Sequence, residues 1–158
     1  MDIRAASIED SESACLILRR SICELCHEDH RGDAATIAAW LANKTAENMR
    51  RWIEQSHVFV AIERTILLGV GAVARSGEIT LNYVSPDARF RGVSKAILAR
   101  LEKHAAQCAI KSITLHGTAT ARRFYLSAGY ADDGEPIKGF GLTFGYPMIK
   151  QLNARAST

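Results

Sequence analysis

Apolar residues recur at helical spacing through the first third of the chain, after a short strand-like segment, DIRAA. One such stripe predicts a first helix over about residues 7–28, with Ser7 as its N-cap. The stripe consists of Cys15, Leu18, Ile22 and Cys26. Gly32 interrupts this pattern, and Asp33 and Thr45 then cap two further predicted helices, ATIAAWLAN and AENMRRWIEQ.

The hydrophobic period changes to two after residue 56, which is typical of strands. Three segments alternate in this way: HVFVAIE, ILLGVGAVA and EITLNYV. Short turns separate them, so they predict an antiparallel meander, which Pro86 ends. Gly69 and Gly71 begin a GxGxxA string inside the second strand. Because a dinucleotide site needs a helix after that string, the glycines indicate a bulge or close backbone packing instead.

The rest of the chain alternates between helix and strand. GVSKAILARLEKHAAQC predicts an amphipathic helix whose inward residues are Val93, Ile97, Leu101 and Ala105. A strand (KSITLHG), a short helix ending at Gly129 (TATARRFYLSAG) and a last strand (GLTFGYPMIKQL) follow. This order predicts one α/β (α+β) domain over residues 1–150, with a mixed, mostly antiparallel sheet flanked by helices. Residues 151–158 are expected to form a loose tail.

Composition places the chain among ordinary globular proteins. Its 158 residues are 47% hydrophobic and 23% charged, enough for one domain with a sizeable core. The net charge of +3 is too small to indicate a nucleic-acid partner without clustering. No segment approaches the roughly 18 apolar residues of a membrane span, and MDIRAASIED lacks the apolar run of a signal peptide. We therefore expect a cytoplasmic protein whose four cysteines are free thiols.

The segment CELCHEDH has the residue types of a metal site. Cys23, Cys26 and His27 spell the C-x-x-C-H of covalent haem attachment, and His30 adds a fourth zinc-type ligand. Haem attachment follows export, which nothing here directs, and no second C-x-x-C or H-x-x-x-H completes a zinc site. On a helix Cys26 faces the core, while Cys23, His27 and His30 share a flank. We therefore expect no metal.

The stretch EITLNYVSPDARFRGVSKAILARL carries the clearest chemical signal. A strand stops at a proline, a basic loop follows, and Gly92 opens a long helix, whose first turn has unpaired N–H groups and a partial positive charge. Gly92 allows an anion to approach the backbone, and Ser94 adds a hydroxyl donor. Arg89, Arg91 and Lys95 supply charge. These features predict a phosphate-binding loop, although a capped helix with a solvated loop would look the same.

The sequence RFRGVS, from Arg89 to Ser94, resembles the Q/R-x-x-G-x-G/A signature of the GNAT superfamily of N-acetyltransferases. TATARRFYLSAGY resembles the second conserved block of that family, A-x-x-F-Y-x-x-x-G-F/Y, and YPMIKQL resembles its ending. The predicted element order agrees with the family over nearly the whole chain. The resemblance implies an enzyme that uses acetyl-CoA as cosubstrate. Ser94 stands where the family more commonly has glycine or alanine, and Thr118 stands where many members have asparagine.

The resemblance also implies cofactor contacts along this stretch. Backbone amides would hold the pyrophosphate, from a loop to which Arg89 and Phe90 also belong. These amides belong to Arg91, Gly92, Val93, Ser94 and Lys95. The strand around Tyr83 and Val84 would part from its neighbour and pair with the pantetheine amides. A backbone N–H near Val84 would polarise the acetyl carbonyl.

Two side chains are candidates for catalysis. Thr118, Ala121 and Tyr125 share one helix face, with Phe124 directed elsewhere, and in the family a tyrosine at the position of Tyr125 often protonates the departing thiolate. Tyr125 could equally be a packing residue at the cofactor edge. Glu78, eleven residues before Arg89, has the spacing of a family general base.

Strand alternation bears on Glu78. It places Ile79, Leu81 and Tyr83 on one face, and Glu78, Thr80 and Asn82 on the other, toward a cleft. Direct contact of Glu78 with the amine, a water relay and a solvent-facing strand end all stay open.

The family resemblance places the acceptor pocket near CHEDHRGD. There a set of acidic and imidazole side chains either faces a cationic amine or belongs to an exposed loop: His27, Glu28, Asp29, His30 and Asp33. Trp40 and Trp52 either line the pocket or pack. We expect direct acetyl transfer to a primary amine of a small molecule, in a ternary complex. A protein or peptide acceptor, a non-catalytic CoA-binding module and a homodimer through the final strand stay open.

Overall fold

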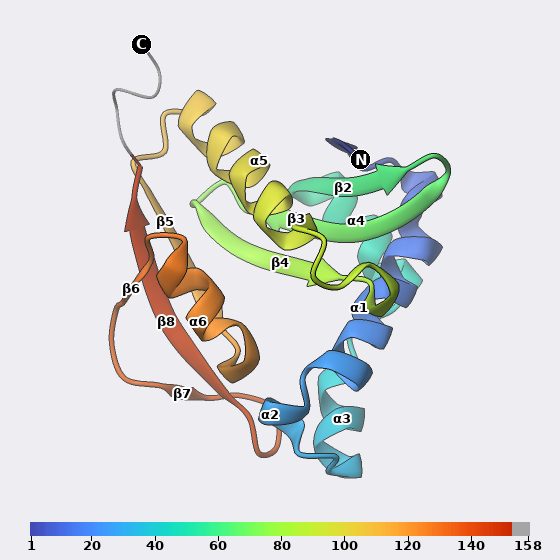
Figure 1. Cartoon of the computed structure of the whole chain (residues 1–158), viewed down its shortest axis with the longest axis vertical. Helices are drawn as coiled ribbons and strands as arrows, with labels where there is room; N and C mark the ends of the chain where they lie inside the picture. The colour runs from blue at the N-terminus through green and yellow to red at the C-terminus, as the bar shows by residue number, and fades with distance from the viewer. Residues whose placement is uncertain (153–158) are drawn as a thin grey trace.

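The computed structural model describes residues 1–152 (Figure 1). The helices are α1 (Ser11–Leu25), α2 (His27–His30), α3 (Ala34–Leu41), α4 (Ala46–Gln55), α5 (Val93–Gln107) and α6 (Ala119–Ser127), with short 3-10 turns η1 (Ile8–Asp10) and η2 (Pro86–Ala88). The strands are β1 (Asp2–Ala5), β2 (His57–Glu63), β3 (Ile66–Val73), β4 (Glu78–Val84), β5 (Ser112–Gly117), β6 (Ala131–Asp132), β7 (Ile137–Lys138) and β8 (Phe144–Gln151). The predicted fold class is confirmed, and β6 and β7 are additions that the sequence pattern did not reveal.

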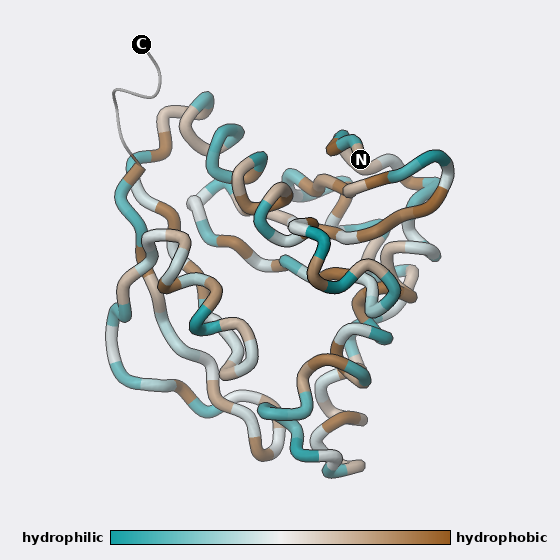
Figure 2. The backbone as a smooth tube through the Cα atoms, in the orientation of Figure 1, coloured by the Kyte–Doolittle hydropathy of each residue, from teal (hydrophilic) through white to brown (hydrophobic). Residues whose placement is uncertain are grey.

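One mixed sheet runs through the molecule in the order β1-β2-β3-β4-β5-β8-β6, with β7 paired to β8. The pair β4 and β5 is parallel, and the other pairs are antiparallel. A hydrophobic cluster beneath α5 and α6 covers one face, and a second beneath α1 and α4 covers the other. Figure 2 shows hydrophobic and hydrophilic residues alternating along α1 and α5, as a buried helix face requires. Within residues 1–152, no helix is both long and apolar enough to cross a bilayer.

The predicted last strand, GLTFGYPMIKQL, forms β8 from Phe144 onward. Gln151 ends β8 and pairs with Ser112, and the Leu152 N–H donates to the Lys111 carbonyl at 2.8 Å. Both residues therefore belong to the sheet region. The remainder of the predicted tail, residues 153–158, lies outside the described residues.

The single first helix predicted over residues 7–28 is wrong, because the chain bends at Cys26 and continues as α2. The Ile22 carbonyl, which a continuous helix would pair with the Cys26 N–H, bonds to His30 Nε2 at 2.9 Å. His30 Nδ1 accepts from the Gly32 N–H at 2.9 Å, so the imidazole ties both ends of this bend. His30 is buried rather than on the predicted flank, whereas the predicted apolar stripe of α1 is buried as expected.

A bulge in β4 changes which side chains share a face. Ala72 pairs with Leu81, but Val73 pairs with Ile79, so Thr80 is the extra residue. Ile79 therefore packs beneath α5, while Leu81 and its neighbour Tyr83 pack beneath α1. The predicted common face of Ile79, Leu81 and Tyr83 is wrong, since an inserted residue reverses the alternation beyond it.

Two glycines of β3 allow α5 to approach the sheet. A Cβ added to Gly69 would lie 2.7 Å from side-chain atoms of Val93 and Ile97, and one added to Gly71 would lie 2.2 Å from Ile97 Cγ2. The predicted inward residues of α5 are all buried against this surface: Val93, Ile97, Leu101 and Ala105. The interpretation of the GxGxxA string as a packing feature is therefore confirmed.

We expect Gly71→Ala to lower the free energy of unfolding by about 1–3 kcal/mol, because the new methyl group overlaps Ile97 and forces α5 outward. Urea unfolding followed by circular dichroism measures this change. Thr65→Ala, in the exposed turn between β2 and β3, is the control and should shift stability by less than about 0.5 kcal/mol. Equal unfolding midpoints for the two variants would contradict the packing argument.

Candidate active site

A cavity of about 370 Å³ opens where β4 and β5 separate. The two strands pair only at Glu78 with Thr114 and Ile79 with Leu115, and they then diverge (Figure 1). Most of the residues predicted to contact a cofactor line this cavity together with Tyr125. They are Tyr83, Val84, Arg89, Phe90, Gly92, Val93, Ser94, Lys95, Thr118 and Ala121. The structure therefore brings the two sequence motifs together at one opening.

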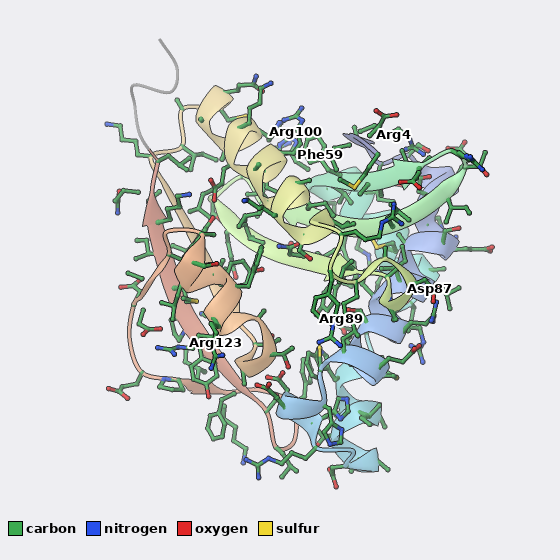
Figure 3. All side chains as sticks on the ribbon, viewed as in Figure 1. Arg4, Phe59, Asp87, Arg89, Arg100 and Arg123 are labelled. Carbon is green, nitrogen blue, oxygen red and sulfur yellow. The ribbon has the colours of Figure 1, made fainter. Side chains whose placement is uncertain are left out.

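The N-terminus of α5 faces this cavity with the features of an anion site. Gly92 is the N-cap, has a φ of 76°, and has open space where a Cβ would lie. No side chain caps the helix, so its first-turn N–H groups keep their hydrogen-bonding capacity. Arg89, labelled in Figure 3, and Lys95 are exposed and line the same cavity. Helix dipole, free amides and side-chain charge all favour a phosphate group here.

The Arg91 side chain does not line the cavity, although the sequence assigned it to the cofactor loop. Its guanidinium donates to Glu63 at the end of β2, at 2.6 Å, and both side chains are about half exposed. Phe90, with a φ of 65°, marks the left-handed turn between the two loop arginines. Of the two loop arginines, Arg89 therefore lines the cavity and Arg91 pairs outside it.

Tyr125 is buried on α6, and its hydroxyl oxygen accepts a hydrogen bond from Asn82 Nδ2 at 3.3 Å. Because that bond uses an oxygen lone pair, the phenolic proton stays available for another acceptor. Burial raises the pKa of Tyr125 to about 12, against a smaller opposing effect of Asn82. The phenol is therefore protonated at neutral pH. Phe124, predicted to point elsewhere, also lines the cavity.

Asp29 holds α6 in place from across the opening. Its carboxylate accepts from the Ala119 N–H at 2.7 Å, and from the N–H and hydroxyl of Thr120 at 3.2 and 2.5 Å. Thr118 adds an N-cap by accepting from the Ala121 N–H at 3.0 Å. The N-terminus of α6, and with it the position of Tyr125, is thus fixed by hydrogen bonds from α2.

The predicted acidic cluster at CHEDHRGD does not form an amine-binding surface. Asp29 caps α6, Asp33 caps α3 by accepting from Thr36, and His30 is bonded to backbone. His27 and Glu28 are exposed and line neither this cavity nor the one beside it. The first helices therefore use their acidic groups to organise the fold.

CELCHEDH gains no metal-binding geometry in the fold. Cys23 is exposed, and burial, with smaller effects of Asp29 and Cys23, raises the pKa of Cys26 to about 12. Across residues 1–152, no three His, Cys, Asp or Glu side chains are grouped to hold a metal ion.

A second cavity of about 310 Å³ adjoins the first and shares Thr80, Tyr83, His116, Gly117 and Thr118 with it. Its outer wall comes from α3, the loop after it, β7 and the turn into β8. The large side chains of this wall include Trp40, Lys44, Lys138, Phe140 and Phe144. Trp40 thus lines a pocket, whereas Trp52 packs against the cluster beneath α1.

His116 is a site residue that the sequence analysis did not select. It follows the last residue of β5 that pairs with β4, is exposed, and lines both cavities. Leu115 faces the α5 side, so strand alternation directs His116 to the opposite face. Glu78 lies before the strands separate and lines neither cavity. The sequence signal for His116 was a polar residue next to the end of the strand KSITLHG.

Comparison with known proteins identifies the family. Residues 26–152 match the acetyltransferase (GNAT) domain. The fold resembles a GCN5-related N-acetyltransferase structure from Rhodopseudomonas palustris, titled aminotransferase, class-II (TM-score 0.87, 21% identity, covering 96% of this chain and 95% of that one). It also resembles PaiA N-acetyltransferase from Thermoplasma acidophilum in complex with coenzyme A (TM-score 0.77, 21% identity, covering 95% of this chain and 98% of that one). A third similar structure is an aminoglycoside 6′-N-acetyltransferase complexed with coenzyme A (TM-score 0.75, 16% identity, covering 97% of this chain and 98% of that one).

No curated protein matches the sequence. The GNAT domain nevertheless spans most of the chain, and both of its sequence motifs line one cavity at the separation of β4 and β5. The chain therefore belongs to the GNAT family of N-acetyltransferases, enzymes that take their acetyl group from acetyl-CoA.

Proposed function

We propose that this enzyme transfers the acetyl group of acetyl-CoA directly to a primary amine of a small molecule, within a ternary complex. The carrying observation is that two cavities meet where β4 and β5 separate, one beside the α5 N-terminus and one walled by α3 and the β7–β8 turn. Acetyl-CoA would occupy the first cavity and the amine the second. A walled cavity of about 310 Å³ favours a small acceptor over a protein segment.

The proposed reaction uses groups on both faces of the opening. The neutral amine nitrogen would attack the thioester carbonyl, the C–S bond would break, and the departing CoA sulfur would take a proton from Tyr125. The proton that the nitrogen gives up on becoming an amide would restore the Tyr125 phenol. His116, on the acceptor side, would remove the proton of the incoming ammonium group, with Glu78 as the rival base. A backbone N–H near Val84 would stabilise the developing oxyanion. At neutral pH Tyr125 holds the proton that this role requires, since burial raises the pKa of the phenol to about 12.

Direct transfer is favoured over an acyl-enzyme. Cys26 is the cysteine that lines the first cavity, and burial raises the pKa of its thiol to about 12. Because the thiolate is the nucleophilic form, such a thiol is a poor candidate for accepting the acetyl group at neutral pH.

Calorimetric titration with acetyl-CoA should give binding that Arg89→Ala weakens at least about tenfold, the effect of losing a charge-assisted hydrogen bond to phosphate. Arg91→Ala is the matched control, because its side chain pairs with Glu63 outside the cavity, and it should change the affinity less than about threefold. ATP and NAD test specificity. Equal losses in the two variants would contradict the assignment of Arg89 alone to the cofactor.

Tyr125→Phe should reduce kcat by about 10²–10⁴-fold and leave acetyl-CoA affinity nearly unchanged, because only the proton donor is lost. Acetylation of a panel of primary amines, followed by release of free CoA, measures this. Since the pKa of Tyr125 is raised to about 12, its acid form persists and kcat should hold up to pH 10. An ordinary tyrosine would be about half ionised there. Unchanged turnover in the variant would favour a packing role.

His116→Gln and Glu78→Gln separate the two candidate bases. We expect His116→Gln to lower kcat/KM by about 10²-fold or more, and Glu78→Gln to change it only a few-fold. The opposite ranking would assign the base to Glu78. Wild-type turnover in both of these variants and in Tyr125→Phe would favour a non-catalytic CoA-binding module.

A further inference from the structure

Lys44 is a buried cation in the wall of the second cavity. The residue is 7% exposed, and no carboxylate among residues 1–152 lies within ion-pair distance of its ammonium group. Nζ donates to Asn43 Oδ1 at 2.7 Å and lies 5.5 Å from the centre of the Phe140 ring. Burial lowers the pKa of this lysine. A buried charge is normally paired, so the missing partner requires an explanation.

The position of Lys44 is fixed by its backbone. The Lys44 carbonyl accepts from Arg19 Nη1 at 2.9 Å and from the Cys15 thiol at 3.2 Å, both on α1. The Lys44 N–H donates to the Leu41 carbonyl at 2.9 Å. The backbone of the loop between α3 and α4 is therefore anchored, and the hydrogen bond to Asn43 holds the ammonium group at the cavity wall.

Besides Lys44, the cavity wall includes an aromatic pair, a second lysine and the hydrogen-bonded carboxylate of Asp29. Trp40 and Phe140 stack with ring centres 6.3 Å apart and planes inclined by 15°. Lys138 adds a second cation. Asp29 is the acidic residue that lines the cavity within residues 1–152, and the N-terminus of α6 occupies both its oxygens.

The Phe140 side of this wall is tied to α3. The Leu142 N–H donates to Thr36 Oγ1 at 3.1 Å, and the Thr143 N–H donates to the Phe140 carbonyl at 2.8 Å. The Cβ that Gly141 lacks would lie 2.2 Å from Thr36 Oγ1, so the turn lies directly on α3. The positions of the Phe140 ring and of Lys44 are therefore both set by contacts within the folded chain.

We propose that the acceptor amine carries a carboxylate that pairs with Lys44, and an apolar or planar body that lies against Trp40 and Phe140. This inference rests on the acetyl-transfer proposal, because it takes the second cavity as the acceptor site. It specifies the substrate class: amino acids in the broad chemical sense, with the acid group directed away from the reacting nitrogen. Polyamines and other polycationic amines would meet two lysines, Lys44 and Lys138, and one carboxylate, Asp29, whose oxygens already accept hydrogen bonds from the N-terminus of α6.

Binding of benzoate and benzamide to CoA-saturated protein tests the anion site, since bound CoA fills the phosphate site at α5. The two probes have similar shape and differ in charge. Wild-type protein should bind benzoate at least about tenfold more tightly than benzamide, as expected for a hydrogen-bonded charge pair. Lys44→Met should abolish the difference, whereas Lys103→Met, on the exposed side of α5, should preserve it. Equal binding of both probes, or no binding of benzoate, overturns the proposal.

Kinetics with 4-(aminomethyl)benzoate and benzylamine form the second arm. The two amines differ by a remote carboxylate, and kcat/KM should be at least about tenfold higher for the acid in wild type and similar for both in Lys44→Met. The wild-type comparison of the two amines does not depend on the variant, so it tests the proposal whatever the stability of Lys44→Met. Faster acetylation of benzylamine would overturn the acidic-acceptor proposal and leave the acetyltransferase assignment intact. Loss of acetyl-CoA binding in calorimetry would instead defeat the assignment itself.

Discussion

The short pairing of β4 with β5 is the constraint on which the rest of the site depends. The strands share two register pairs, whereas β5 pairs with β8 at six positions from Ser112 to Gly117. The bulge at Thr80 adds local twist to β4 at the point of separation. Beyond it, the backbone groups of β4 that face β5 have no strand partner. A cavity between two halves of one sheet follows directly, with unpaired peptide groups along one side.

Because the sheet supplies few hydrogen bonds across the opening, side-chain hydrogen bonds fix the positions of its two sides relative to each other. Asp29 joins α2 to α6, and Asn82 joins β4 to Tyr125. Thr36 joins α3 to the turn before β8. These are single hydrogen bonds or small clusters, partly buried, and each ends at a residue that lines or borders a cavity. The same contacts therefore stabilise the opening and set the positions of the proposed acid and the acceptor wall.

Electrostatics distinguish the two ends of the site. The cofactor end combines the α5 N-terminus with Arg89 and Lys95, which suits phosphates. The acceptor end holds Lys44 within an aromatic wall. Asp29 of α2 and Asp33 before α3 serve as helix caps, and the exposed Glu28 lines neither cavity. A site positive at both ends favours an anionic cosubstrate and an acid-bearing acceptor.

Apart from α2, β6 and β7, the sequence by itself determined the element order. It also determined the inward face of α5 and a loop and helix fit for phosphate, because periodicity, glycine and charge act over a few neighbouring residues. Only the tertiary structure decided which side chains meet. The bulge at Thr80 reversed the faces of β4, His30 ended α1 by taking a backbone carbonyl, and Glu63 drew Arg91 away. His116 and Lys44 line the second cavity through packing of segments distant in the chain, and no local pattern records such contacts.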